Sequence, residues 1–132
     1  MSGRNLRVLV VDDEPEIRCL LTDILEGAGH EVASAPDGRS AERMLADGSG
    51  PFDLAFLDYH MPEGDGLAVM GRLREIQPDL RVVLVTGRTG PLPPASSSPS
   101  PDPDRSFTLL TKPFSLALVE ALLAKAAWGE DL

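Results

Sequence analysis

Two kinds of apolar pattern alternate along the chain. Short continuous apolar runs are typical of strands buried on both faces of a parallel sheet, and longer stretches with apolar residues at helical spacing are typical of amphipathic helices. Strand character is found at residues 6–11, 31–35, 53–57, 81–85 and 107–110. Because helical patterns lie between most of these strands, the order predicts an α/β sheet with helices on both faces.

Residues with special backbone preferences set the predicted helix ends. The first helix begins at Pro15, which suits a first turn, and stops at Gly27 and Gly29. Asp37 is the expected N-cap of the second helix, and Pro78 closes the third. The apolar stripe of the first helix predicts the side chains that face the core: Ile17, Leu20, Leu21, Ile24 and Leu25.

The last predicted helix spans residues 115–128, with Ser115 as its N-cap. Leu116, Val119 and Leu123 are expected to face the sheet. This leaves three further large apolar residues, which are candidates for self-association or for binding a partner if they do not fold back on their own domain: Leu118, Leu122 and Trp128.

A proline-rich stretch stands where a fourth interior helix is due. Residues 91–103 hold six prolines and four serines, and a proline inside a helix costs roughly 3 kcal/mol. We therefore expect a loop or a disordered segment at about residues 88–106. It is interpreted first as a tolerated surface insertion. The alternatives are that phosphorylation orders the segment or that it is itself a docking sequence. The whole of residues 1–132 is predicted to form one domain.

Composition excludes several partners. The formal net charge of −9 is unsuited to a nucleic-acid backbone or an anionic membrane surface, which need clustered lysine and arginine. No apolar stretch is long enough to span a bilayer. The single cysteine, Cys19, permits no internal disulfide and fits a reducing compartment, so we predict a cytoplasmic protein.

Polar residues follow the strands in a fixed order. Asp12 and Asp13 end the first strand, Asp58 ends the third, Thr86 ends the fourth, and Lys112 with Pro113 ends the fifth. In an open parallel sheet, ligands bind outside the carboxyl ends of the strands. Each residue alone is weak evidence, because acids at strand ends often only cap the next helix. The ordered set is the informative signal.

Such a cluster fits metal-assisted phosphoryl transfer. Close carboxylates repel one another, and a hard cation such as Mg²⁺, which prefers oxygen ligands, removes that conflict. Asp58 is the candidate nucleophile, forming an aspartyl phosphate. Lys112 and the cation would offset charge on the transferring oxygens, and Thr86 would hydrogen-bond the phosphoryl group once it arrives.

The combined motifs resemble the receiver domain of two-component response regulators. The matching segments are "VLVVDDEPEIR", "DLAFLDYHMPEGDGL", "VVLVTG" and "TKPF", between about Arg7 and Ala127. The resemblance implies a flavodoxin-like fold of five strands in the order 2-1-3-4-5. It also implies that Asp58 accepts a phosphoryl group from a phosphohistidine on a histidine kinase or a phosphotransfer protein. The domain would catalyse its own phosphorylation and dephosphorylation without being a turnover enzyme.

The resemblance further implies individual roles. Mg²⁺ would be held by Asp13, Asp58 and the backbone carbonyl of His60, with Asp12 acting through water. Lys112 would pair with the phosphoryl group, and Thr86 would be the switch hydroxyl. Gly87 would leave the phosphoryl path open.

Two positions depart from the family pattern. Leu109 stands where most receivers carry an aromatic residue that turns inward with the switch hydroxyl, so that coupling is not expected in its usual form. The proline-rich stretch replaces a helix that contributes to the usual output face. An atypical output face is therefore predicted.

Three other functions were weighed. A pseudo-receiver that binds without phosphorylation is disfavoured by the complete set of acids. A hydrolase of the haloacid-dehalogenase type needs a D-x-D nucleophile motif at its first strand, where this chain has "DDEP". A flavodoxin needs a hydroxyl-rich phosphate loop after strand one, where this chain has three acids.

Overall fold

The computed structural model describes residues 5–61, 64–87, 108–111 and 115–127. Its elements follow one another along the chain as β1 (Arg7–Val11), α1 (Pro15–Gly27), β2 (Glu31–Ala35), α2 (Gly38–Ala46), β3 (Leu54–Asp58), β4 (His60–Met61), β5 (Gly64–Asp65), α3 (Gly66–Ile76), β6 (Arg81–Thr86), β7 (Thr108–Thr111) and α4 (Leu116–Ala127).

Five of the strands form one parallel sheet. Its order is β2-β1-β3-β6-β7, while β4 and β5 form a separate antiparallel pair. Counting the five parallel strands in chain order, this is the predicted order 2-1-3-4-5, and the flavodoxin-like fold is confirmed. The proposed loss of the fourth helix falls at residues 88–107, outside the described residues. The boundaries of a single domain over the whole chain stay a prediction.

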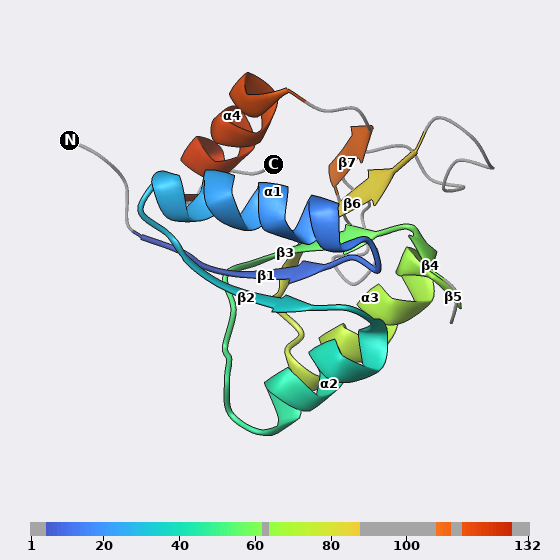
Figure 1. Cartoon of the computed structure of the whole chain (residues 1–132). Coiled ribbons are helices and arrows are strands. Elements are labelled where there is room, and N and C mark those ends of the chain that lie inside the picture. The colour runs from blue at the N-terminus through green and yellow to red at the C-terminus, as the bar shows by residue number, and fades with distance from the viewer. Residues whose placement is uncertain (1–4, 62–63, 88–107, 112–114, 128–132) are drawn as a thin grey trace.

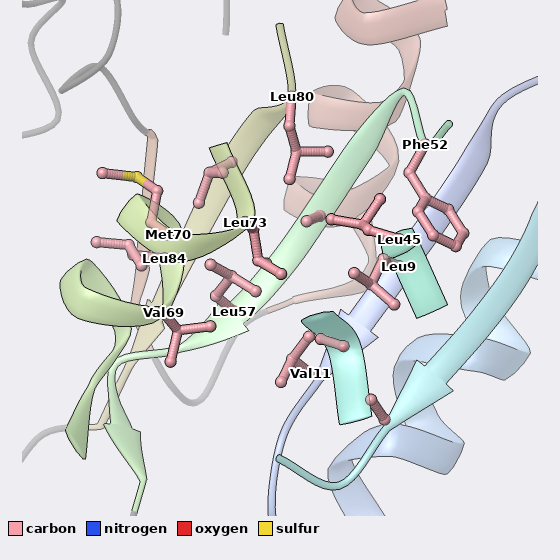
Figure 2. Close-up of a cluster of buried hydrophobic side chains, with 14 of the residues drawn as sticks. Leu9, Val11, Leu45, Phe52, Leu57, Val69, Met70, Leu73, Leu80 and Leu84 are labelled. Atoms are coloured by element: carbon pink, nitrogen blue, oxygen red, sulfur yellow. The ribbon is translucent and has the colours of Figure 1, made fainter. Parts of the chain in front are cut away.

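Helices cover both faces of the sheet, α1 and α4 on one and α2 and α3 on the other (Figure 1). Successive side chains of a strand point to opposite faces. In β1, Leu9 and Val11 accordingly pack toward α2 and α3, whereas Val8 and Val10 pack toward α1 and α4. Figure 2 shows the first of these clusters, in which Leu9 and Leu57 from the sheet meet Leu73 from α3. Burial on both faces explains why the strands are continuously apolar.

The predicted helix ends are confirmed. Helix α1 starts at Pro15 and ends at Gly27, and Gly29 adopts a φ of 92° just beyond it, in the left-handed region that favours glycine. The backbone N–H of Leu118 donates to Ser115 Oγ at 3.1 Å, which makes Ser115 the cap of α4. Helix α3 ends at Ile76, before Pro78.

Two leucines predicted to face the core are exposed. Leu116 is 54% exposed, although Val119 and Leu123 of the same stripe are buried. Helical side chains lean toward the N-terminus of their helix, so that of Leu116, at the first position, points beyond the packed part of α4. Leu20 is 47% exposed because it lies roughly a third of a turn from the centre of the buried stripe of α1, at Leu21 and Leu25.

His30 follows the glycine just beyond α1. It is partly buried, and its Nδ1 accepts a hydrogen bond from the backbone N–H of Leu6 at 2.9 Å. Burial lowers the pKa of His30 and favours the neutral imidazole, which can accept this bond. The side chain thereby ties the chain just before β1 to the turn that follows α1. Cys19 is exposed, as predicted.

The N-cap of α2 provides a test of this fold. The Asp37 carboxylate accepts the backbone N–H of Ser40 at 2.8 Å, and this bond is the main reason that the pKa of Asp37 lies below its ordinary value of 3.8. Asp37→Ala should lower the free energy of unfolding by about 1 kcal/mol. Because the folded pKa is depressed, the ionised carboxylate stabilises above the unfolded pKa, and this contribution is lost as pH falls through the folded value.

Asp37→Asn is the matched control, since it keeps the accepting oxygen without the charge. It should retain most of the wild-type stability near neutral pH and lose the acid-dependent part. Urea unfolding of the three proteins between pH 3 and pH 7 measures both effects. Equal stability of the alanine variant and the wild type would contradict the assignment of the cap.

Candidate functional site

The register of the central strands brings two of the predicted acids together. Val11 of β1 pairs with Leu57 of β3, so the next residues, Asp12 and Asp58, lie side by side at the carboxyl ends of adjacent strands. Both follow the alternation that directs Val10 and Phe56 toward α1 and α4. Both are buried, with 1% and 3% of their surface exposed.

Four carboxylates converge at this edge of the sheet. One oxygen from each of Asp12, Asp13, Glu14 and Asp58 lies within 4.8 Å of the others. Asp13 and Glu14 are exposed, so the cluster has a buried half on the strands and a solvent-facing half on the loop after β1. The sequence prediction contained three of these acids. It regarded Glu14 only as a possible helix cap, although the run "DDE" was visible.

Asp12 is held from three directions. Its backbone N–H donates to the carbonyl of Ala35 at 3.2 Å, and its Oδ1 accepts the backbone N–H of Glu14 at 2.9 Å. Its backbone carbonyl accepts a bond from the guanidinium of Arg18 at 2.7 Å. Asp12 therefore orders the local turn and lies beside Asp58. It does not cap α1, whose N-cap residue is Glu14, with no side-chain capping bond. Arg18 was missed at the sequence level because only the folded turn brings it back over β1.

Asp58 ends the strand at the centre of the sheet. It pairs with Val85 of β6, and the following N–H, that of Tyr59, donates to the Val85 carbonyl at 2.8 Å. Its Oδ1 accepts the backbone N–H of His60 at 3.2 Å. The His60 side chain is exposed, as expected, and its ring meets that of Tyr59 edge-on at 4.8 Å. The carboxylate is thus placed by backbone on a rigid element.

Thr86 and Gly87 follow one step further along β6. Thr86 is fully buried, one residue beyond the partner of Asp58, and its Oγ1 donates to the carbonyl of Gly87 at 3.3 Å. No described atom lies within 4 Å of the place that a Cβ at Gly87 would occupy. The role of Gly87 in the phosphoryl path stays a prediction.

The other predicted residues lie on or beyond β7. Leu109 is partly buried and packs against the cluster shown in Figure 2. Thr111 ends β7 opposite Thr86, at the same edge as the acids. Lys112 and Pro113, which come next in the sequence, lie outside the described residues, so the convergence of Lys112 on the acids stays a prediction.

Comparison with known proteins identifies the family. The model of the response regulator receiver domain matches residues 8–95, about two thirds of the chain, including Asp12, Asp13, Asp58 and Thr86. The chain belongs to the response regulator receiver family. The matched range ends before Lys112.

Relatives of two kinds carry this domain. The response regulator receiver protein CpdR of Brucella abortus is 36% identical over 110 residues, which cover 83% of this chain and 87% of that protein. The DNA-binding transcriptional regulator NtrC of Azospirillum brasilense is 32% identical over 119 residues, which cover 90% of this chain but only 24% of that protein. The receiver is therefore nearly the whole of one relative and about a quarter of the other.

Solved structures agree with the fold. The response regulator TrrA of Thermotoga maritima, in complex with Mg²⁺ and BeF, has a TM-score of 0.70 at 31% identity, covering 96% of this chain and 99% of that one. NtrX of Brucella abortus, in complex with ADP, has a TM-score of 0.75 at 31% identity, covering 94% of this receiver and 26% of that chain. Within the described part of the receiver, no helix is both long and apolar enough to cross a membrane.

Proposed function

We propose that this receiver accepts a phosphoryl group on Asp58 in a Mg²⁺-dependent reaction. The observation that carries the proposal is the position of Asp58, buried at the end of the central strand and within 4.8 Å of three other carboxylates. A cluster of four acids, two of them buried, is unfavourable by mutual repulsion unless a cation or proton offsets it. Its retention at the ligand-binding edge of a parallel sheet supports a reactive site.

Asp58 is the favoured acceptor among the four acids. Asp12 is equally buried, but its Oδ1 accepts the Glu14 N–H and so orders the β1–α1 turn. Asp13 and Glu14 lie on that exposed turn, where their positions are less restrained. Asp58 belongs to β3 itself and pairs with Val85 of β6, whereas Asp12 lies just beyond the end of β1. A place within a strand restrains a nucleophile in the orientation it needs.

The transfer is a substitution at phosphorus. An Asp58 carboxylate oxygen forms the new O–P bond, and the P–N bond to the donor imidazole breaks. The leaving nitrogen keeps the electron pair of the P–N bond. The histidine of the donor protein is thereby regenerated as a neutral or protonated imidazole. The donor is a phosphohistidine on a histidine kinase or a phosphotransfer protein, as the family membership supports. The protein would catalyse this change on itself and would not turn over a small substrate.

The donor set fits Mg²⁺. Carboxylate oxygens are its preferred protein ligands, and the cluster combines buried with solvent-facing oxygens. Asp13, Asp58 and the backbone carbonyl of His60 would hold the ion, with Asp12 acting through water. When bound, Mg²⁺ would offset the charge of the carboxylates and of the transferring phosphoryl oxygens. The complex of TrrA with Mg²⁺ and BeF, in a relative 31% identical, supports this assignment.

Residues of the last two parallel strands would complete the site. Lys112 would pair with the phosphoryl group, and Thr86 would exchange its present bond to the Gly87 carbonyl for one to a phosphoryl oxygen. Gly87 leaves space for the incoming group, and Pro113 would fix the backbone that follows Lys112. These roles make Thr86 the first residue to respond to phosphorylation.

The output face is proposed to be atypical and to include α4. Leu109 already packs against the core and carries no ring or hydroxyl, so the usual movement of an aromatic side chain is not available. On α4, Leu118 is 47% exposed, and Leu122 is partly buried against the core. We propose that α4 mediates self-association or partner binding in the cytoplasm. Trp128 and the proline-rich stretch, also named as candidates, lie outside the described residues.

Phosphorylation is tested by intact mass after incubation with Mg²⁺ and acetyl phosphate. The wild type should gain the mass of one phosphoryl group, whereas Asp58→Asn should gain none because it lacks the nucleophilic carboxylate. Asp53→Asn, which changes an acid at the opposite end of β3, is the matched control and should be modified like the wild type. No gain of mass in a wild type that binds Mg²⁺ would favour a pseudo-receiver.

Metal binding is tested by thermal unfolding. Mg²⁺ should raise the midpoint of the wild type relative to chelator, because an ion that binds only the folded state stabilises it by RT ln(1 + [L]/Kd), about 2.7 kcal/mol at a hundredfold excess over Kd. Asp13→Ala should abolish most of that response. It should also be at least as stable as the wild type in chelator, since it removes one of four clustered charges. Identical midpoints with metal and with chelator would rule out the site.

Self-association is tested by light scattering with and without acetyl phosphate. The wild type should show a species larger than the monomer in at least one state, and Leu118→Glu should abolish it by charging the exposed face of α4. Leu20→Glu, at an equally exposed leucine of α1, serves as the control and should leave the larger species in place. A monomer in both states would leave partner binding as the only proposed role of α4.

A further inference from the structure

Gly66 lies directly behind the proposed acceptor. It is the first residue of α3 and is buried, and the β4–β5 pair joins it to β3. Its backbone N–H donates to the carbonyl of Tyr59 at 2.8 Å. This bond holds the start of α3 against the end of β3.

There is no room for a side chain at this point. A Cβ on Gly66 would lie 2.9 Å from the backbone oxygen of Asp58, 3.0 Å from the Cα of Tyr59 and 3.0 Å from Cδ2 of Leu84. Observed Cβ atoms essentially never approach other atoms to less than 3.0 Å, so something must move. Positive φ within the described residues occurs at Gly29 and Gly48, so the constraint at Gly66 is space rather than dihedral freedom.

The three neighbours differ in how easily they yield. The Leu84 methyl is the end of a flexible side chain and can shift by a small rotation. The Asp58 oxygen and the Tyr59 Cα belong to the main chain at the end of β3, which is hydrogen-bonded to β1 on one side and to β6 on the other. A side chain at position 66 therefore displaces either the start of α3 or the peptide that carries Asp58.

We propose that Gly66 is a positioning residue for the Asp58 carboxylate. Its missing side chain lets α3 begin against the Asp58–Tyr59 peptide, which fixes the turn in which the His60 N–H reaches Asp58 Oδ1. The inference rests on the proposed function, because it assigns Gly66 a part in phosphoryl transfer. Gly66 touches neither donor nor phosphoryl group in this scheme and acts only through Asp58.

The test compares two glycine substitutions in the same helix. Gly66→Ala introduces the clash, whereas a Cβ at Gly71 would meet nothing within 4 Å, so Gly71→Ala changes helix propensity alone. Phosphorylation by acetyl phosphate is followed at saturating Mg²⁺, at a temperature where all variants are fully folded. Gly66→Ala should lower the rate constant by about tenfold or more, since a misplacement of about 1 Å can cost up to about 10²-fold. Gly71→Ala should match the wild type.

Two further measurements do not depend on phosphorylation. The Mg²⁺ affinity of Gly66→Ala should fall, because Asp58 is also a proposed ligand, while that of Gly71→Ala should not. In metal-free protein, the amide at position 66 should exchange its hydrogen faster in Gly66→Ala, since its bond to the Tyr59 carbonyl is lost. A residue important only for stability would lower the melting temperature and leave rate and affinity per folded molecule unchanged.

A double variant separates the two kinds of clash. Leu84→Val removes Cδ2 and frees that side of position 66, but it leaves the Asp58 oxygen in place. Gly66→Ala with Leu84→Val should stay slow in phosphorylation and weak in Mg²⁺ binding. If the phosphorylation rate and the Mg²⁺ affinity both recover to the level of Leu84→Val alone, the inference is overturned. The defect of Gly66→Ala would then come from core packing against Leu84. A Gly66→Ala protein with wild-type rate and affinity would overturn it too.

Failure of the proposed function gives a different pattern. If the wild type takes up no phosphoryl group, that function is wrong, and the Mg²⁺ affinities and amide exchange then decide the inference. Lowered affinity with faster exchange in Gly66→Ala alone supports positioning of the Asp58 carboxylate as a ligand. A Mg²⁺ affinity and an amide exchange rate that are unchanged in Gly66→Ala would exclude a positioning role for Gly66.

Discussion

Two buried carboxylates side by side are the constraint around which this domain is built. Asp12 and Asp58 end neighbouring strands at the centre of the sheet, and both are almost completely shielded from solvent. Like charges at such a place destabilise the fold unless the surroundings hold them and a cation or proton offsets them. The sheet provides the rigidity, because apolar side chains on both of its faces fix β1 and β3 in register.

The loops around the acids extend this restraint. The turn after β1 is ordered through Asp12 itself, by bonds to the Glu14 N–H and the Arg18 guanidinium. The turn after β3 is ordered by the bond from the His60 N–H to Asp58 and by the close packing of Gly66 against the Asp58–Tyr59 peptide. Each acid thus takes part in the local structure that positions it. A site built in this way is preorganised before any ligand binds.

Two features of the described residues bear on the proposed output face. Leu109 already packs inward and has neither ring nor hydroxyl with which to respond to Thr86. The exposed leucines of α4, Leu116 and Leu118, present apolar surface on the helix beside α1 (Figure 1).

The sequence by itself determined the five strands of the parallel sheet, the described helices and the order of acids at the strand ends, because these depend on periods and caps local to each segment. The short pair β4 and β5 was not predicted. It also identified the family from ordered motifs. Only the tertiary structure decided that Glu14 joins the acids, that Arg18 returns to Asp12, that His30 accepts a buried bond and that Gly66 has no room for a side chain. Those facts depend on register and helix packing, which bring together residues that no local period relates. The exposure of Leu116 was likewise decided by where the packed part of α4 begins, which a helical period does not reveal.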